Sequence, residues 1–235
     1  MPFCDSEDLF GKVERRITSG LGGFPEPEAF NHLSQLVEGL AGMHACGVAH
    51  HDFSLENVMV DGAVGCIIID FGMCIRLPLR RVAGQPPVPL RPSNQWPCNC
   101  GKLLYKAPEN MRPRASFDAF KADVWAVGVC FFLLLVGLPP WESTIGPVPT
   151  DQRYVVIARD RDVRRLLDLW RCWCRGYPAR GLTSYFPPTA QHINLSDSCL
   201  DLLQGMLTED PALRYDLEAV RNHPWVLAQG AIEEL

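Results

Sequence analysis

The feature that most constrains the fold is an uninterrupted apolar run near the middle of the chain. Residues 124–138 form a stretch of 15 residues without a charged or polar side chain, and it stops at Pro139 and Pro140. A helix that crosses a bilayer needs about 20 apolar residues, so this run predicts no membrane span. A helix that is apolar on every side belongs at the centre of a core. The run therefore predicts a buried helix around which a globular domain is built.

A second constraint is a pair of short runs rich in β-branched residues. Residues 58–60 read V-M-V and residues 66–69 read C-I-I-I, with an Asp-Gly turn at 61–62 between them. Two such runs joined by an Asp-Gly turn are typical of a β-hairpin. The sequence therefore predicts a small hairpin in front of the apolar helix.

Polar residues stand at the ends of this hairpin. Asp52 and Asn57 precede its first strand, and Asp70 follows its second. Because the hairpin brings its two outer ends together, we expect these three side chains to gather. Two carboxylates and an amide suit the binding of a hard cation and the acceptance of a proton from a nucleophile.

The same stretch carries a family resemblance. Residues 50–57 read H-H-D-F-S-L-E-N and residues 70–72 read D-F-G, which resembles the catalytic loop and the D-F-G of eukaryotic protein kinases. Further family landmarks follow in order: A-P-E at 107–109, K-A-D-V-W-A-V-G at 121–128, D-P-A-L-R at 210–214 and H-P-W at 223–225. The alternative is an unrelated helical domain with chance matches, but linked motifs in the order of the family favour the kinase family.

The resemblance implies a mainly α fold: a protein-kinase-like C-lobe with a small β-hairpin region that carries the catalytic and D-F-G loops. Residues 1–235 would be a partial kinase domain comprising the hinge and C-lobe, with the activation segment at 73–109. L-E-N at 55–57 and Y-K-A-P-E at 105–109 are more similar to serine/threonine kinases than to tyrosine kinases. The implied reaction is transfer of the γ-phosphoryl group of Mg·ATP to a protein hydroxyl, which makes ATP and a protein substrate the expected partners.

Catalytic and metal-binding roles follow from the resemblance. It implies that Asp52 accepts or orients the proton of the substrate hydroxyl, and that Asn57 and Asp70 hold Mg²⁺ against the ATP phosphates. Around the rest of the nucleotide it places Cys4, Asp8, Glu56 and Met59. The backbone at Cys4 would meet the adenine, Asp8 the ribose, and Met59 the floor under the base. In this family the residue at Glu56 also often touches the peptide substrate.

Motifs of the kinase small lobe are not found in these 235 residues. There is no Gly-rich loop, no lysine of the V-A-I-K type and no helix C glutamate, and Met1 falls where the gatekeeper would be. We therefore expect Met1 to be an internal methionine and the N-lobe to be missing from a truncated sequence. A genuine lone C-lobe is the alternative.

One departure concerns the control of activity. His51 replaces the arginine that normally pairs with a phosphorylated activation loop, and a histidine is mostly neutral at pH 7. Between Gly72 and Ala107 the only hydroxyl residues are Ser93 and Tyr105. We predict that activation-loop phosphorylation is not the switch.

A second departure is reciprocal. Ser54 stands where serine/threonine kinases usually have a lysine that neutralises the γ-phosphate, and Lys102 stands where they usually have a threonine. An ammonium on a long stem is a movable point charge. The hypothesis is that Lys102 is catalytic and supplies the missing cation. The alternative is that Lys102 is a solvated loop charge and the site is weakened.

The remaining elements are predicted from apolar spacing and caps. Helices are expected over residues 28–45 and 151–173, one more begins after a Ser196 cap, and the last begins after Asp216 and ends near Trp225. Residues 76–100 are predicted to be a long, poorly ordered loop because they are rich in Pro, Arg and polar residues.

Two structural roles are also expected from the resemblance. Glu109 and Arg214 would form a buried ion pair, and Asp123 would hold the backbone of the catalytic loop from the apolar helix.

Composition limits the other classes of function. The net charge of −5 gives no basic surface for nucleic acid. The ten cysteines form no C-x-x-C pair, which favours reduced thiols in a cytoplasmic or nuclear protein over a zinc site. Two further classes stay open: a pseudokinase that binds without turnover, and a C-lobe used as a protein-interaction module.

Overall fold

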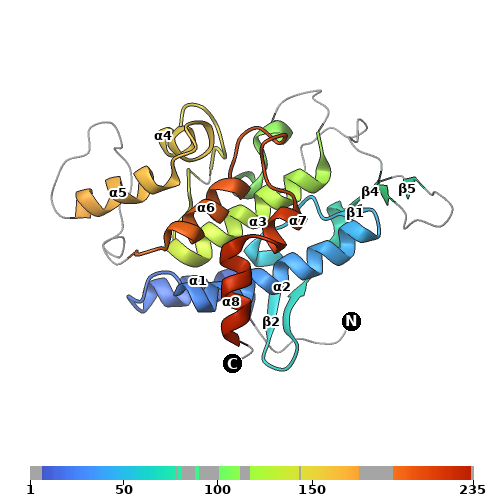
Figure 1. The fold of residues 1–235 in the computed structure, drawn as a ribbon, viewed down its shortest axis with the longest axis horizontal. Helices are drawn as coiled ribbons and strands as arrows, with labels where there is room; N and C mark the ends of the chain where they lie inside the picture. Colours follow the sequence, from blue (N-terminus) through green and yellow to red (C-terminus); the bar gives the residue numbers. More distant parts are fainter. Residues whose placement is uncertain are drawn as a thin grey trace.

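The computed structural model describes residues 7–77, 79–80, 88–89, 101–111, 117–142, 144–174 and 193–233. Over these residues helices predominate, and the strands pair into three two-stranded antiparallel sheets (Figure 1). The helices are α1 Leu9–Thr18, α2 Glu26–Ala45, α3 Ala119–Val136, α4 Gln152–Tyr154, the π-helix η5 Val155–Arg159, α5 Val163–Cys174, α6 Asp197–Met206, α7 Leu217–Arg221 and α8 Pro224–Glu233. The strands are β1 Val48–Ala49, β2 Val58–Asp61, β3 Gly65–Ile68, β4 Ile75–Arg76, β5 Leu79–Arg80 and β6 Val88–Pro89. Four 3-10 turns complete the description: η1 Leu55–Asn57, η2 Phe71–Met73, η3 Leu103–Tyr105 and η4 Pro108–Met111. The predicted helix-rich fold with a small β region is confirmed.

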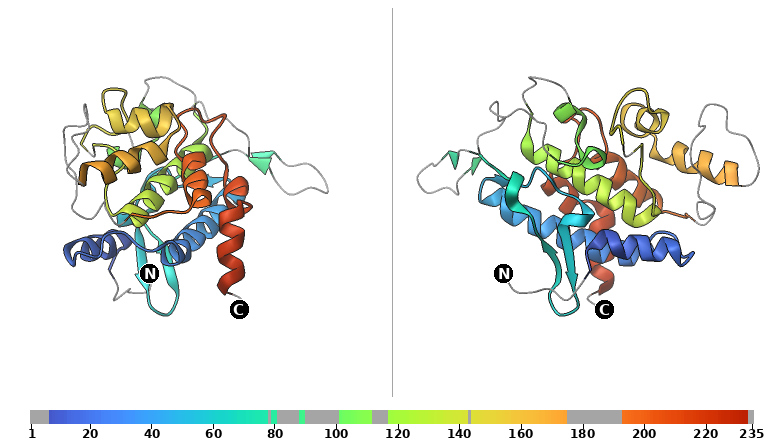
Figure 2. Two further views of the ribbon diagram at one scale, coloured as in Figure 1. Left: turned by 60° about the vertical axis from the view of Figure 1, so that its left-hand side comes forward. Right: turned by 180° about the vertical axis from the view of Figure 1, so that it is seen from behind.

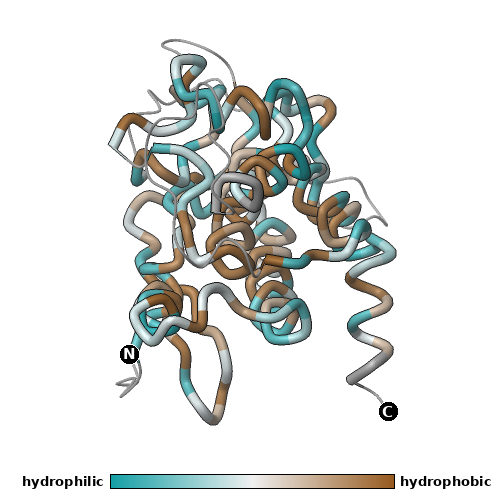
Figure 3. Tube along the Cα trace, turned by 90° about the vertical axis from the view of Figure 1, so that its left-hand side faces the viewer, coloured by the Kyte–Doolittle hydropathy of each residue, from teal (hydrophilic) through white to brown (hydrophobic). Residues whose placement is uncertain are grey.

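Helix α3 is the core of the domain. Every residue of α3 except Lys121 is buried, and α2 and α6 pack on it (Figure 1). Figure 3 shows the apolar segments gathered in the interior of the molecule. Among the described residues α3 is the one helix long and apolar enough to cross a membrane, but 94% of it is buried inside the domain. Burial of this kind identifies a core helix, as the apolar run predicted.

The ends of α3 are set by its caps. The Asp118 carboxylate accepts hydrogen bonds from the backbone N–H groups of Phe120 and Lys121, at 2.9 and 3.2 Å, so the helix begins before the apolar run. Gly137 has φ +77° and ends the helix in the left-handed conformation that glycine adopts without strain. The helix is therefore shifted toward the N-terminus relative to residues 124–138.

The C-terminal region differs from its prediction. Asp216 caps a helix as expected, with its Oδ1 accepting from Ala219 N at 2.9 Å, but that helix is the short α7. A separate helix, α8, begins at Pro224 and continues past Trp225 to Glu233. The prediction of one helix that ends near Trp225 is wrong, because a proline cannot continue a helix but readily starts one.

The predicted hairpin forms from β2 and β3, paired in antiparallel register from Val58↔Ile68 to Asp61↔Gly65. It projects from the helices and packs against α1 and α2 (Figure 2). Three residues, 62–64, separate the paired ends, so the turn is longer than the two residues at 61–62. The Asp61 carboxylate closes it by accepting from the N–H groups of residues 63 and 64.

The other predicted helices are confirmed with adjusted limits. Helix α2 begins two residues before the predicted start of residues 28–45, and the predicted helical region 151–173 divides into α4, η5 and α5. Ser196 caps α6, accepting from Cys199 N at 3.2 Å. Met1, Cys4, Ser93 and most of the predicted loop 76–100 lie outside the described residues.

Candidate active site

The backbone of the loop at residues 50–57 is held by a side chain of α3. Asp123 is 1% exposed, and its two carboxylate oxygens accept the backbone N–H groups of His50 and His51, each at 2.8 Å. His44 Nε2 on α2 lies 2.9 Å from Asp123 Oδ2. A buried carboxylate with several donors fixes the backbone around it. The predicted role of Asp123 is confirmed.

Two of the three polar residues expected to gather at the end of the hairpin, Asp52 and Asn57, are in direct contact. Asn57 Nδ2 donates to the backbone oxygen of Asp52 at 2.8 Å and lies 3.4 Å from Asp52 Oδ2. Ile69 N donates to Asn57 O at 2.9 Å, which sets Asp70 immediately beyond Asn57. Asp70 is exposed, has φ +62°, and accepts from Gly72 N at 3.3 Å.

Lys102 joins this group from a distant part of the sequence. Its Nζ donates to Ser54 Oγ at 2.7 Å and lies 3.4 Å from Asn57 Oδ1, while its backbone N–H donates to Asp52 Oδ1 at 3.2 Å. Gly101, with φ +82°, permits this approach, because a Cβ there would lie 3.1 Å from a backbone oxygen of the loop at 50–57. The Lys102 ammonium therefore lies beside Ser54, and the two residues of the reciprocal change are in contact.

His51 occupies a closed environment. Its side chain is 9% exposed, stacks on Phe117 with ring centroids 5.3 Å apart, and has no hydrogen-bond partner among the described residues for either ring nitrogen. Burial lowers the pKa of His51, and the nearby Lys106 lowers it further, against the opposing pull of Asp123. His51 is therefore neutral at pH 7.

The predicted nucleotide residues are partly brought together. Asp8 and Met59 face each other in a β-bridge, which joins the start of α1 to β2. The Asp8 carboxylate also accepts from Gly11 N at 2.7 Å and thereby caps α1. Glu56 Oε2 is buried, and burial raises the pKa of Tyr105, with the nearby Glu56 carboxylate raising it further. The sequence interpretation missed the capping role of Asp8, although an Asp before an apolar helical run is a recognisable signal.

His50 is a site residue that the sequence interpretation did not single out. Its Nε2 lies 3.1 Å from Ile69 O, and its ring contacts Phe53 and Phe71 at centroid distances of 5.4 and 5.8 Å. His50 thus connects the loop at 50–57 to the segment that carries Asp70. Its place at the start of the H-H-D motif was the available signal.

The donor set fits Mg²⁺. Asn57 Oδ1 and the Asp70 carboxylate are hard oxygen donors, and exposed Asp70 leaves room for water and phosphate oxygens. Mg²⁺ is usually bound by one or two carboxylates together with water and substrate phosphates. Among the described residues no cluster of three or more His, Cys, Asp or Glu side chains could hold a metal by itself.

A buried ion pair joins residues 101–111 to the connection between α6 and α7. Arg214 Nη1 and Nη2 donate to the two Glu109 carboxylate oxygens at 2.7 and 2.9 Å. Both side chains are buried, and the Arg214 guanidinium also lies over the Trp125 ring, 4.9 Å from its centroid. The predicted ion pair is confirmed.

This fold and site define a protein kinase domain. Residues 1–226 match the family model described as "Protein kinase domain", and the chain belongs to that family. Among its relatives, the chain is 30% identical over 229 residues to "Serine/threonine-protein kinase chk1" of Schizosaccharomyces pombe, covering 96% of this chain and 37% of that protein. It is 27% identical to "Serine/threonine-protein kinase CHK1" of Saccharomyces cerevisiae, covering 98% and 36%, and 30% identical to "Testis-specific serine/threonine-protein kinase 3" of Mus musculus, covering 87% and 60%. The chain spans little more than a third of the length of the two yeast relatives.

Proposed function

We propose that the chain is the C-lobe, with part of the hinge, of a serine/threonine protein kinase that transfers the γ-phosphoryl group of Mg·ATP to a protein hydroxyl. The observation that carries the proposal is the contact among Asp52, Asn57 and Lys102 on a loop anchored by Asp123. The serine/threonine names of the relatives support the substrate class. A cytoplasmic or nuclear location is proposed with it, as is an activation segment at residues 73–109.

The proposed chemistry assigns one task to each side chain. The substrate hydroxyl oxygen bonds to the γ-phosphorus, the bond to the β-γ bridging oxygen breaks, and the hydroxyl proton passes to Asp52. Asn57 and Asp70 would hold Mg²⁺, which neutralises charge on the phosphates when bound. Lys102 would supply a further cation toward the γ-phosphate, since its Nζ reaches Ser54 at 2.7 Å.

A small lobe from outside these residues would complete the nucleotide site. Phe71 and Met73, next to Asp70, are 51% and 47% exposed, which is unusual for large apolar side chains beside a catalytic residue. We propose that a small lobe with a Gly-rich loop covers them. Cys4, Asp8, Glu56 and Met59 would then form the C-lobe side of the ATP site.

A second candidate is a binding module without turnover. The specific observation that favours it is that His51 is neutral and buried, in a loop that carries Ser54 in place of the usual lysine. Such a protein would keep the fold and bind nucleotide or a partner, but would transfer no phosphoryl group.

The test uses the full-length protein with radiolabelled ATP and a mixed protein substrate. Asp52→Asn is expected to lower kcat by at least about a hundredfold, because the proton acceptor is lost. Glu14→Gln, on the exposed side of α1, is the matched control and should leave kcat unchanged. Tight Mg·ATP binding without turnover in the unmodified protein would support the second candidate. No binding of Mg·ATP at all would point to an interaction module.

A further inference from the structure

A small cavity lies beside Asp52. Its volume is about 20 Å³, which is enough for one water-sized group. Asp52 is partly exposed, whereas His51, Lys106 and Asn110, which also line the cavity, are only 7–9% exposed. The cavity therefore extends inward from the place where the proposed function puts the substrate hydroxyl.

Buried polar atoms around this cavity lack partners. The two ring nitrogens of His51 and the Oδ1 atom of Asn110 have no hydrogen-bond partner among the described residues. Buried polar atoms in folded proteins are almost always hydrogen-bonded, because leaving one unsatisfied costs free energy. The neutral His51 ring offers one donor and one acceptor, and the Asn110 amide offers either, depending on its orientation. These atoms indicate that a polar group of a ligand fills the cavity.

Lys106 decides which charge the ligand should carry. It is 7% exposed and forms no hydrogen bond or ion pair with another residue that the structure describes. Its ammonium lies close enough to His51 to lower the pKa of that ring. Burying an ammonium ion without a partner anion is costly. A group that fills the cavity beside Lys106 should therefore be negatively charged.

The two carboxylates that line the cavity already accept from other donors. Asp123 accepts two backbone N–H groups and lies 2.9 Å from His44 Nε2. Asp52 Oδ1 accepts from Lys102 N at 3.2 Å. Neither carboxylate forms an ion pair with Lys106. The Lys106 ammonium is therefore available to a carboxylate on a ligand.

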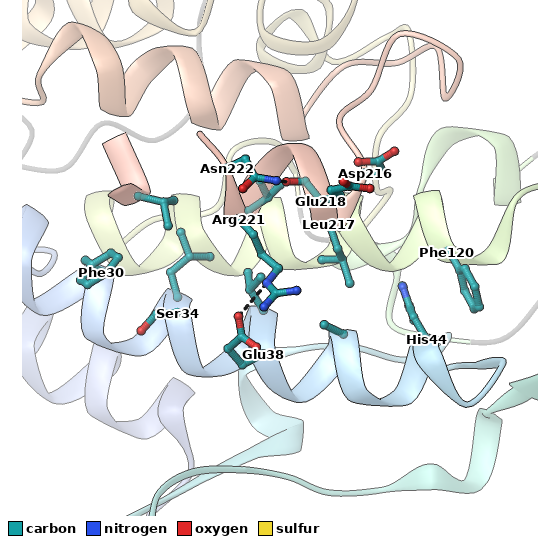
Figure 4. A pocket seen from close by; sticks show the side chains of 15 residues that line it. Phe30, Ser34, Glu38, His44, Phe120, Asp216, Leu217, Glu218, Arg221 and Asn222 are labelled. Atoms are coloured by element: carbon teal, nitrogen blue, oxygen red, sulfur yellow. Dashed lines mark hydrogen bonds and ion pairs between the residues drawn. The ribbon is translucent and has the colours of Figure 1, made fainter. Parts of the chain in front are cut away.

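A groove between α2, α7 and α8 is larger but differs in this respect. Its volume is about 620 Å³, and Glu38 pairs with Arg221 across it at 2.8 Å (Figure 4). Asp216 accepts from Ala219 N at 2.9 Å and caps α7. In the part of the chain that the structure describes, no residue lining this groove has a buried side-chain N or O atom without a partner. Unsatisfied polar groups therefore distinguish the cavity beside Asp52 from the larger groove.

We propose that the cavity beside Asp52 binds the side-chain carboxylate of an acidic residue next to the phosphoacceptor of the protein substrate, with Lys106 as its cationic partner. One carboxylate oxygen fills the cavity and accepts from Lys106 and from the ring N–H of His51. Neighbouring Cα atoms of a peptide are about 3.8 Å apart, so a residue next to a hydroxyl at Asp52 can reach the cavity. The inference rests on the proposed function, which places the hydroxyl at Asp52, and adds a substrate preference to it.

The test is fluorescence anisotropy with the full-length protein, without ATP, and labelled peptides that carry one serine flanked on both sides by Asp or by Asn. The Asp peptide should bind at least about tenfold more tightly than the Asn peptide, because it gains charge-assisted hydrogen bonds. Lys106→Met keeps an unbranched side chain at the buried position and should abolish this difference. Lys12→Met makes the same change on α1, outside the cavity, and should leave the difference intact.

The comparison of Asp and Asn peptides in the unmodified protein is decisive without any variant. Equal affinity for the two, or no measurable binding of either, would overturn the proposal, and the cavity would then hold an ordered water only. A preference for Asp that survives Lys106→Met, in a variant shown to be folded by urea denaturation, would overturn the role of Lys106. Phosphorylation of the same peptides with radiolabelled ATP separates the two proposals. A preference that depends on Lys106 but comes without turnover would contradict phosphoryl transfer and leave the carboxylate site in place.

Discussion

Arg214 and Lys102 are two cations that hold the same segment, residues 101–111, in opposite surroundings. Arg214 has a fully buried side chain, and its five donated hydrogen bonds go to Glu109 and to three backbone oxygens. Lys102 is exposed, and its Nζ has Ser54 and Asn57 as its partners among the described residues. One end of the segment is therefore fixed, and the other carries a charge that can move.

The different burial of Arg214 and Lys102 gives the two side chains different roles, one in stability and the other in the proposed chemistry. A buried guanidinium with every donor satisfied cannot leave its place without a large cost in free energy. An exposed ammonium on a flexible stem can follow a phosphate with little cost to the fold. Substitutions at the buried end should therefore act on unfolding, and substitutions at the exposed end on turnover.

The largest effect is expected at the buried end. Arg214→Ala leaves the Glu109 carboxylate buried and unpaired, so the free energy of unfolding should fall by about 3–5 kcal/mol. Urea denaturation measures it. Arg164→Ala, which removes an exposed pair with Asp197, is the control, with a change within about 0.5 kcal/mol. Equal losses in both variants would remove the contrast between buried and exposed cations.

At the exposed end the effect should appear in turnover. In the full-length kinase, Lys102→Met should lower kcat about a hundredfold, equivalent to about 2.7 kcal/mol, with an unchanged unfolding midpoint. The double variant Ser54→Lys, Lys102→Thr restores the arrangement usual in the family and should recover most of the activity. Unchanged kcat in Lys102→Met would mean that Lys102 is a solvated loop charge.

Asp123, on the buried helix α3, holds the backbone of the loop at 50–57 that Lys102 contacts. Asp123→Asn replaces one acceptor oxygen by an NH₂ group that faces a backbone N–H, and we expect a loss of about 2 kcal/mol in unfolding free energy. Amide exchange at His50 and His51 should become faster. Normal exchange at these amides would show that the loop is held by other contacts.

The smallest effect concerns His32, a half-buried histidine whose protonated form is disfavoured in the folded protein. Burial, aided by Lys12, lowers the pKa of His32 from 6.5 to about 4. The unfolded chain therefore binds a proton below pH 6.5 that the folded chain excludes, so stability is full above pH 6.5 and falls as the pH falls toward 4. Allowing for solvent screening, the loss is about 1–2 kcal/mol. In His32→Gln the unfolding free energy should decline less over the same range, and parallel curves for the two proteins would contradict the assignment.

The sequence by itself determined the parts of this protein that depend on local pattern and on motifs. The apolar run predicted the core helix α3, and Ser196 and Asp216 predicted caps, because each needs only neighbouring residues. The resemblance predicted the Glu109–Arg214 pair and the anchoring role of Asp123. The reciprocal change at Ser54 and Lys102 suggested that these two side chains meet.

Only the tertiary structure decided the rest. The closed surroundings of His51 and the contacts of the His50 ring with Ile69 and Phe71 depend on which side chains, brought from distant parts of the chain, fill the space. A groove lies where α2 meets α7 and α8, which come from a distant part of the sequence. Apolar periodicity shows which face of a helix is buried but not which distant element covers it, because that choice is made by packing of the whole domain.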